Sequence, residues 1–412
     1  MGLSTRLVAL LLVAGTVAWR RADYFSGALD PTIVVKGLVV VGAVLLSLSI
    51  RPDRPAGRLG TGTLWFLGAL LLSSLVGALA EGEIVAGTIV ATRVVLVTVA
   101  LFVLLRRRSV EEVIAALAWA CAVVVTVAVL SGVSSLADGR LRGGVPPLSP
   151  NEVALLAGIA LVHVAWRVLQ HPVAAWEYGL ACWWLVLVWL SGSRTGLLML
   201  VLGLLAMLLL TRRFRPSLVV GALVTVAAGS VLLINTGALV GFAERDGTGT
   251  DTLDSRFNAW RAAVVWAESV WRGAFGGGLS LKVIPVVDRF RDTQPLDSSW
   301  VSALVQAGVV GLLVALVWML WMVRNVIASL RSDRVLHIGL TVFLVGRSTV
   351  ESGLFDATPA FLVVLVVSLA VEGGTWERPQ SASARAGWTG GRAVGQRGPN
   401  RSVHRPHRGA RA

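Results

Sequence analysis

The chain has 412 residues, of which 55% are hydrophobic and 15% are charged. Soluble domains carry about 25% charged residues, so this composition excludes one large soluble core and indicates a membrane protein throughout. The formal net charge of +14 raises nucleic acid as a partner. We expect no such binding, because the excess positive charge lies in short gaps between apolar segments and in the C-terminal tail.

A series of apolar segments runs along the chain. A helix of about 20 apolar residues crosses a bilayer core of about 30 Å. We therefore predict an all-α membrane protein with about twelve transmembrane helices. The predicted spans are 5–19, 32–50, 62–80, 84–105, 110–130, 152–169, 173–190, 195–211, 217–240, 299–323, 334–351 and 357–371.

The charges between these segments predict an orientation. Arginine clusters such as 106–108 and 212–215 fall in alternate gaps, and positive residues mark the cytoplasmic side. Both termini are then cytoplasmic. We assign residues 1–371 to one polytopic transmembrane domain. The basic tail, 372–412, has eight arginines and no apolar periodicity, so it is predicted to be disordered.

A short polar break at residues 191–196 separates two apolar runs and is predicted to face outward. It contains Arg194. An arginine at the junction of two membrane helices is costly unless an anion meets it. We interpret Arg194 as a ligand of a lipid-linked diphosphate, with plain interfacial anchoring as the alternative.

The longest predicted outer loop spans residues 241–298. Within it, apolar residues recur at helical spacing from 255 to 272. This pattern predicts one amphipathic helix whose tryptophans suit the membrane interface; a plain surface helix covering the bundle is the alternative. The glycines at 276–278 lack a P-loop lysine, so we expect no nucleotide site there.

Arginines on the predicted outer face are the candidate substrate ligands. Guanidinium groups bind phosphate oxygens through paired hydrogen bonds, and the candidates here are Arg142, Arg194, Arg261 and Arg347. Glu351 lies one turn from Arg347 and is a possible ion-pair partner. Arg93 is isolated within a span, where either a functional role or hydrogen bonds to carbonyls would explain it.

Two residues near the ends of outer loops carry alternative roles. Asp297 is predicted either to cap the helix that follows or to act as a carboxylate base toward an acceptor hydroxyl. Asn151 is predicted to cap the helix that follows, and capping alone or capping with a further role in the site are the two alternatives. The predicted outer face has no histidine or cysteine, so we expect neither a histidine-based triad nor a zinc site, and no metal or other cofactor.

Four local patterns occur along the chain in a fixed order. They are Arg142-Gly143 followed by Pro150-Asn151, Ser193-Arg194 at the start of a span, Arg256 and Trp260-Arg261 before the glycines at 276–278, and Asp297-Ser298-Ser299-Trp300 before Gly308 and Gly311. With these patterns the chain resembles the O-antigen ligase and O-antigen polymerase family (the Wzy/WaaL type).

This resemblance implies a GT-C-like glycosyltransferase of the inner membrane. Its substrate would be a glycan linked to a polyprenyl diphosphate, and its acceptor a glycan or a lipid. Arg194 matches the arginine of the family's Ser-Arg pattern, and Arg261 matches the loop arginine. Ligases of the family usually carry histidine where this chain has Asp297, which favours a polymerase or a related transferase.

Two functions from other classes also fit the pattern of spans. One is a transporter or flippase of lipid-linked precursors, and the other is a non-catalytic scaffold of a polysaccharide assembly complex. Transporters often contain helices broken within the membrane, and none is evident in this sequence. Catalysis by the purified protein would separate the transferase from both alternatives.

Overall fold

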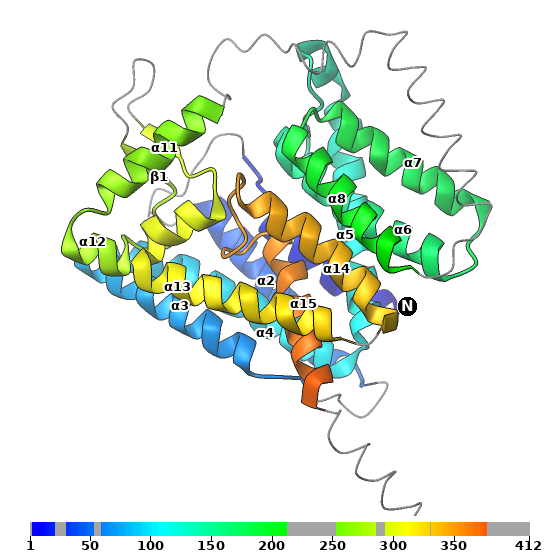
Figure 1. Cartoon of the computed structure of the whole chain (residues 1–412), viewed down its shortest axis with the longest axis horizontal. Coiled ribbons are helices and arrows are strands. Elements are labelled where there is room, and N and C mark those ends of the chain that lie inside the picture. Colours follow the sequence, from blue (N-terminus) through cyan, green and yellow to red (C-terminus); the bar gives the residue numbers. More distant parts are fainter. Residues whose placement is uncertain are drawn as a thin grey trace, which may run out of the picture. The chain divides into compact units, whose positions relative to one another are not determined.

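The computed structural model describes residues 2–20, 30–52, 59–211, 253–285, 293–329 and 331–376. The apolar helices in these ranges are α1 (Leu3–Thr16), α2 (Pro31–Ser49), α3 (Gly62–Ala80), α4 (Ile84–Arg107), α5 (Val110–Ser131), α6 (Pro150–Gln170), α7 (Ala175–Leu190), α8 (Arg194–Leu210), α13 (Ser299–Ala328), α14 (Arg331–Ser348) and α15 (Pro359–Trp376). Figure 1 shows how they are arranged.

Each of these helices coincides with a predicted span. The remaining predicted span, 217–240, lies outside the described residues, so the total of twelve stays a prediction. Six of the described helices, α2 to α6 and α13, are long and apolar enough to cross a membrane. The chain is therefore an all-α membrane protein over its described length.

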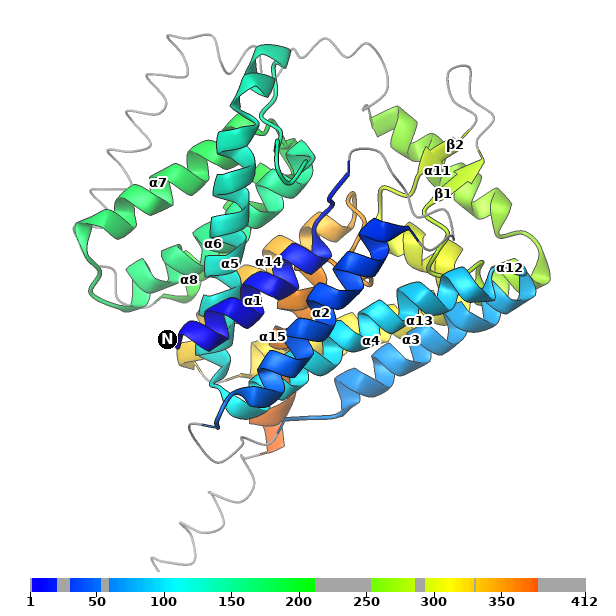
Figure 2. The same ribbon diagram turned by 180° about the vertical axis from the view of Figure 1, so that it is seen from behind.

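The most deeply buried helix is α15. Every side chain from 359 to 369 is buried, and α15 runs through the middle of the bundle in both Figure 1 and the reverse view in Figure 2. Around it, α13 packs along α3, α8 along α14, α6 along α7, and α1 against α2 and α5. A helix that is apolar on all sides can be buried in this way.

The gaps predicted to face outward lie together at one end of the helices. Arg272, from the large loop, forms two hydrogen bonds with the Glu81 carboxylate after α3, at 2.8 and 2.9 Å. Arg140 donates to the carbonyl of Gly192 between α7 and α8 at 3.3 Å. These contacts agree with the alternation that the charges predicted, while the side of the membrane stays a prediction.

At the opposite end, carboxylates from other helices cap helix N-termini. The first turn of a helix leaves backbone N–H groups without intrahelical partners. Glu372 of α15 accepts hydrogen bonds from the backbone N–H groups of Gly62 and Thr63, at 2.5 and 3.1 Å, at the start of α3. Glu112 of α5 accepts from the N–H of Gly2 before α1, at 3.2 Å.

The described part of the large loop contains two helices over the stretch where one was predicted. They are α11 (Leu253–Trp266) and α12 (Val270–Phe275), and the Ser269 side chain caps the second by accepting from the N–H of Arg272. Ala259 and Ala263 form the buried face of α11, whereas Phe257 and Val264 are exposed. The single amphipathic helix over 255–272 is therefore a wrong prediction, because a capping serine starts a new helix within it.

A short antiparallel hairpin follows these helices. Strands β1 (Val283–Pro285) and β2 (Thr293–Pro295) pair with Val283 opposite Pro295. The N–H of Leu296 donates to the carbonyl of Lys282 at 3.0 Å and extends this pairing by one residue on each strand. The hairpin thereby brings residue 282 beside the segment that leads into α13.

Helix α13 is broken, which corrects the expectation that no membrane helix is interrupted. Gly308 has φ 68°, a conformation that favours glycine. Three carbonyl groups just before the break accept hydrogen bonds from outside the helix. These run from Gly277 N to Val305 O (2.9 Å), from Gly278 N to Gln306 O (3.0 Å) and from Ser73 Oγ to Ala307 O (2.7 Å).

The backbone after α12 fits closely against this break. A Cβ atom at Gly308 would lie 2.1 Å from the carbonyl oxygen of Ala274, and one at Gly77 of α3 would lie 2.3 Å from that of Phe275. Glycines at these positions let three backbones approach one another. The large loop is thus fixed to α3 and α13 by main-chain contacts.

Candidate functional site

A cavity of about 550 Å³ opens where the loops predicted to face outward meet. Its walls come from the starts of α6 and α13, the end of α14, the loop between α14 and α15, the hairpin and the segment after α1. Cavities of roughly 300–1,000 Å³ are typical of sites for small organic ligands. The position and size of this cavity make it the candidate site.

Three of the five predicted site residues line this cavity: Arg142, Asp297 and Arg347. They come from segments far apart in the sequence. The turn that carries Arg142 is held by hydrogen bonds from its own N–H to Ser135 Oγ at 2.8 Å and from Gly143 N to Leu148 O at 2.9 Å. The Arg142 side chain is exposed, and within the described residues its guanidinium group has no hydrogen bond or ion pair.

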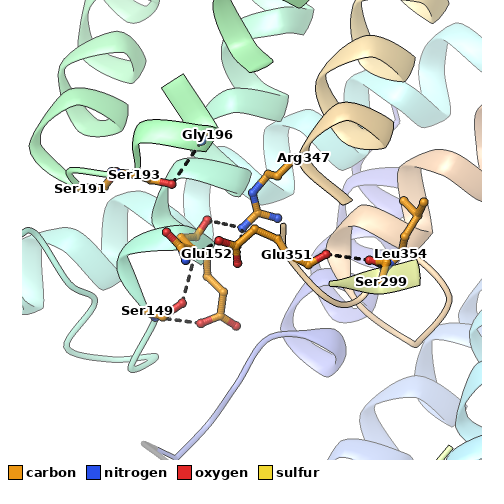
Figure 3. Close-up of polar contacts among 10 residues, drawn as sticks. Ser149, Glu152, Ser191, Ser193, Gly196, Ser299, Arg347, Glu351 and Leu354 are labelled. Carbon is orange, nitrogen blue, oxygen red and sulfur yellow. Dashed lines mark hydrogen bonds and ion pairs between the residues drawn. The ribbon is translucent and has the colours of Figure 1, made fainter. Parts of the chain in front are cut away.

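Arg347 is buried at the end of α14 and is partly engaged by the protein. Its Nη2 atom donates to the carbonyl of Asn151 at 2.7 Å and lies 3.8 Å from Glu351 Oε2. Figure 3 shows the Arg347 and Glu351 side chains facing each other. The predicted pairing of these two residues is confirmed.

Asn151 does not cap α6, contrary to prediction. The helix begins at Pro150, and the N-cap is Ser149, whose Oγ accepts from Glu152 N at 3.2 Å while Glu152 Oε2 accepts from Ser149 N at 2.8 Å. This reciprocal arrangement satisfies the helix start. The amide of Asn151 instead donates to Glu351 Oε1 at 2.6 Å.

Asp297 also precedes the helix cap instead of forming it. Helix α13 begins at Ser299 with Ser298 as the N-cap residue. The N–H and Oγ of Ser299 both donate to the carbonyl of Glu351, at 3.1 and 2.7 Å, and Oγ accepts from Leu354 N at 3.1 Å (Figure 3). The start of α13 is therefore fixed to the loop after α14, and Asp297 lies half-buried in the cavity wall.

Arg194 and Arg261 do not line the cavity. Arg194 is the exposed first residue of α8, whose N-cap Ser193 accepts from Gly196 N at 3.3 Å. A Cβ atom at Gly196 would lie 3.0 Å from Cβ of Ala154, so this start packs against the first turns of α6. Arg261 is exposed on α11. The structure thus separates these two arginines from the three residues in the cavity wall.

The cavity wall also contains a pair that the sequence patterns did not single out. Lys282 Nζ donates to Asp356 Oδ2 at 2.7 Å. Burial raises the pKa of Asp356, but the Lys282 and Arg93 charges and hydrogen bonds from Lys282 and Ala357 together hold it below its usual value. Lys282 is one of two lysines in a chain rich in arginine, and this is the signal that could have pointed to it.

Arg93 reaches the same region from within α4. Its Nη2 atom donates to the carbonyls of Gly15 and Ala357 at 2.8 and 3.2 Å. Of the two explanations proposed for this intramembrane arginine, hydrogen bonding to carbonyls is therefore confirmed. These bonds tie the end of α1 and the loop before α15 to α4.

The cavity wall carries charges of both signs. Arg142, Arg347 and Lys282 line it together with the carboxylates of Asp297, Glu351 and Asp356. Within the described ranges, no three or more histidine, cysteine, aspartate or glutamate side chains are grouped as metal ligands. A lining of this kind suits a ligand that presents both anionic oxygens and hydroxyl groups.

Comparison with known families gives a match to part of the chain. A family model described as O-antigen ligase matches residues 179–316, about a third of the chain. This segment covers most of α7, then α8, α11, α12, the hairpin and the first part of α13 through the break at Gly308. No curated protein matches the sequence. The match confirms the resemblance over residues 179–316, which contain three of the four local patterns, and this segment is similar to the O-antigen ligase family.

Proposed function

We propose that this protein is a glycosyltransferase that moves a glycan from a polyprenyl diphosphate to a sugar hydroxyl during surface polysaccharide assembly. One observation carries the proposal. Arg142, Asp297 and Arg347, selected from three distant segments as phosphate ligands and base, lie in the wall of one cavity. The family match supports a ligase or polymerase type of activity.

The transfer needs a nucleophile, a base and a stabilised leaving group. The oxygen of the acceptor hydroxyl attacks the anomeric carbon of the donor glycan and forms the new C–O bond. The bond from that carbon to the phosphate oxygen breaks, and the polyprenyl diphosphate leaves with the electron pair. Asp297 takes the hydroxyl proton as general base. No further co-reactant is consumed.

The arginines have different parts in this step. Arg142 is exposed and uncommitted within the described residues, so its guanidinium group makes the direct contact with the diphosphate oxygens. Arg347 already donates to the Asn151 carbonyl, so it adds positive charge from the wall. Charge placed in advance where an anion develops lowers the barrier to its departure.

The two arginines outside the cavity, Arg194 and Arg261, are assigned roles away from the reacting atoms. Arg194 stands at the N-terminus of α8, beside the first turns of α6. Helix N-termini favour anions, so we assign Arg194 to the approach of the diphosphate. Arg261 is exposed on α11, where its contact would be with lipid headgroups or with the glycan outside the cavity.

Transport of lipid-linked precursors is the competing function, and the break in α13 is a feature that transporters share. In transporters, such breaks free backbone groups to bind the cargo. Here the carbonyls of residues 305–307 are taken by Gly277, Gly278 and Ser73. The break therefore supports anchoring of the loop and does not favour transport.

The decisive experiment is a transfer assay with purified protein in lipid nanodiscs. The substrate is lipid-linked glycan extracted from membranes of the source cells, and products are sized by electrophoresis. We expect wild type to yield a longer or transferred glycan. If glycan moves across a sealed vesicle membrane without any change in size, the protein is a transporter and the proposal is wrong.

A further inference from the structure

The ion pair between Lys282 and Asp356 is not used by the diphosphate chemistry. Both side chains line the cavity, and about one-fifth of each is exposed, 22% and 21%. The two atoms are 2.7 Å apart, compared with 3.8 Å for Arg347 and Glu351. Lys282 is thus a tightly paired cation whose partner also lines the cavity, whereas Arg142 is exposed and has no partner for its guanidinium group among the described residues.

A closed ion pair is a poor ligand for phosphate but a good one for hydroxyl groups. The Asp356 carboxylate already neutralises Lys282, so a diphosphate would have to displace it. Both groups retain further capacity, because an ammonium has three donors and a carboxylate about four acceptor positions. Sugar hydroxyls both donate and accept, and they match such a neutral surface. Ser302 and Gln306 add polar groups to the same wall.

We infer that Lys282 and Asp356 bind the hydroxyl groups of the acceptor sugar. This inference rests on the proposed transferase function and adds the acceptor site to it. The hairpin supports the placement, since the N–H of Leu296 donates to the carbonyl of Lys282 at 3.0 Å, and Asp297 follows directly. An acceptor held by Lys282 therefore presents its hydroxyl next to the residue proposed as base.

The pair has a purely structural alternative, which is to fasten the hairpin to the loop before α15. A charge-reversed double variant, Lys282→Asp with Asp356→Lys, separates the two roles. It restores a fastening ion pair but exchanges the positions of the donors and acceptors. The pair of Arg272 and Glu81 is the matched control, because it also ties the loop to the helices and does not line the cavity.

The experiment measures the binding of two probes to the full-length protein in nanodiscs. One is the glycan released from its lipid by mild acid, which lacks the diphosphate. The other is inorganic pyrophosphate. We expect Lys282→Met and Asp356→Asn to weaken glycan binding about tenfold or more, the loss typical of a hydrogen bond to a charged group. The same two variants should bind pyrophosphate as wild type does. Arg142→Ala should weaken pyrophosphate binding and leave glycan binding unchanged, and Arg272→Ala should change the binding of neither probe.

The outcomes distinguish the acceptor site from the proposed function. The acceptor site is overturned if Lys282→Met binds the glycan as tightly as wild type does. It is also overturned if the charge-reversed variant regains both full glycan affinity and thermal stability, or if wild type binds pyrophosphate but not the released glycan. Restored thermal stability without restored glycan binding supports it. Pyrophosphate that binds wild type and Arg142→Ala equally contradicts the proposed function itself.

Discussion

The charged side chains in the cavity wall differ in how many hydrogen bonds and ion pairs they already make within the protein. Arg347 is buried, donates to the Asn151 carbonyl and faces Glu351. Arg142 is exposed and makes no such contact within the described residues. A committed guanidinium group must exchange one partner for another when it binds phosphate, so its net gain is smaller. Substitutions at the two positions should therefore have different consequences.

Arg142→Ala should abolish glycan transfer without loss of stability, because the side chain is exposed and holds no neighbour among the described residues. Arg142→Lys should recover only part of the activity, since an ammonium lacks the planar pair of donors. Transfer assays and thermal unfolding on the same preparations check this. Full transfer by the alanine variant would remove Arg142 from the site.

Arg347→Ala should instead lower the free energy of unfolding. It removes the hydrogen bond to the Asn151 carbonyl and the positive charge beside Glu351, both in a buried position. An unsatisfied buried group costs about 1–3 kcal/mol. Thermal unfolding should show the loss, and unchanged stability would indicate that the Glu351 pair contributes nothing to the fold.

Asp297→Asn should lose transfer activity and keep wild-type stability, because asparagine retains the shape but cannot take a proton. Equal expression with full transfer by the asparagine variant would show that the acceptor proton goes to water.

Residues of the cavity wall could be predicted from the sequence only where the residue type and its position next to a predicted span were enough to select them. Outer-face arginines and an aspartate before a helix selected Arg142, Asp297 and Arg347, which line the cavity, but also Arg194 and Arg261, which do not. The caps at Asn151 and Asp297 were misplaced by one or two residues, although Ser149, Pro150 and Glu152 already form the pattern of a helix start. Lys282 and Asp356 escaped prediction because they meet only when two distant loops fold together.

At the scale of the helices, the helix ends and the break depend on contacts between distant residues, which the apolar pattern of the sequence does not predict. Eleven of the twelve predicted spans are helices in the described residues, because length and composition alone are sufficient to identify a span. The apolar runs did not predict the break in α13, since Gly308 lies in a continuous apolar run and glycine is common in membrane helices. Nor did they show that Glu372, assigned to the tail, belongs to α15 and caps α3.

Glu372→Ala should destabilise the protein by about 1–2 kcal/mol, the loss typical of a removed N-cap. The carboxylate is buried and accepts from Gly62 N and from both N–H and Oγ1 of Thr63. Glu372→Gln should lose less, because its amide oxygen still accepts. Thermal unfolding in detergent measures both, and an alanine variant as stable as wild type would contradict the capping role.

Gly308→Ala should destabilise the protein and detach α12 from α13. The position has a positive φ, and the added Cβ would lie 2.1 Å from the Ala274 carbonyl oxygen. Gly68→Ala in α3 is the control, since a Cβ there meets nothing within 4 Å. Faster proteolysis of the loop in the Gly308 variant alone is the expected result, and equal rates would argue against anchoring.

On the scale of the whole molecule, the two sets of gaps lie at opposite ends of the helices, and the cavity belongs to the set predicted to face outward. A cysteine at position 250 in a chain whose two natural cysteines are replaced by serine should react with a membrane-impermeant reagent on intact cells. Reaction only after lysis would place the cavity in the cytoplasm and exclude surface assembly.

The main-chain contacts between α12 and α13 bear on how this protein can be recombined with its relatives. The turn at Gly277 and Gly278 supplies hydrogen bonds to carbonyls of a membrane helix, and such groups are costly to leave unsatisfied away from water. A chimera that receives a foreign outer loop alone would lose these donors. The loop and α13 therefore form one unit of exchange, and acceptor preference should move between relatives only when both are transplanted together.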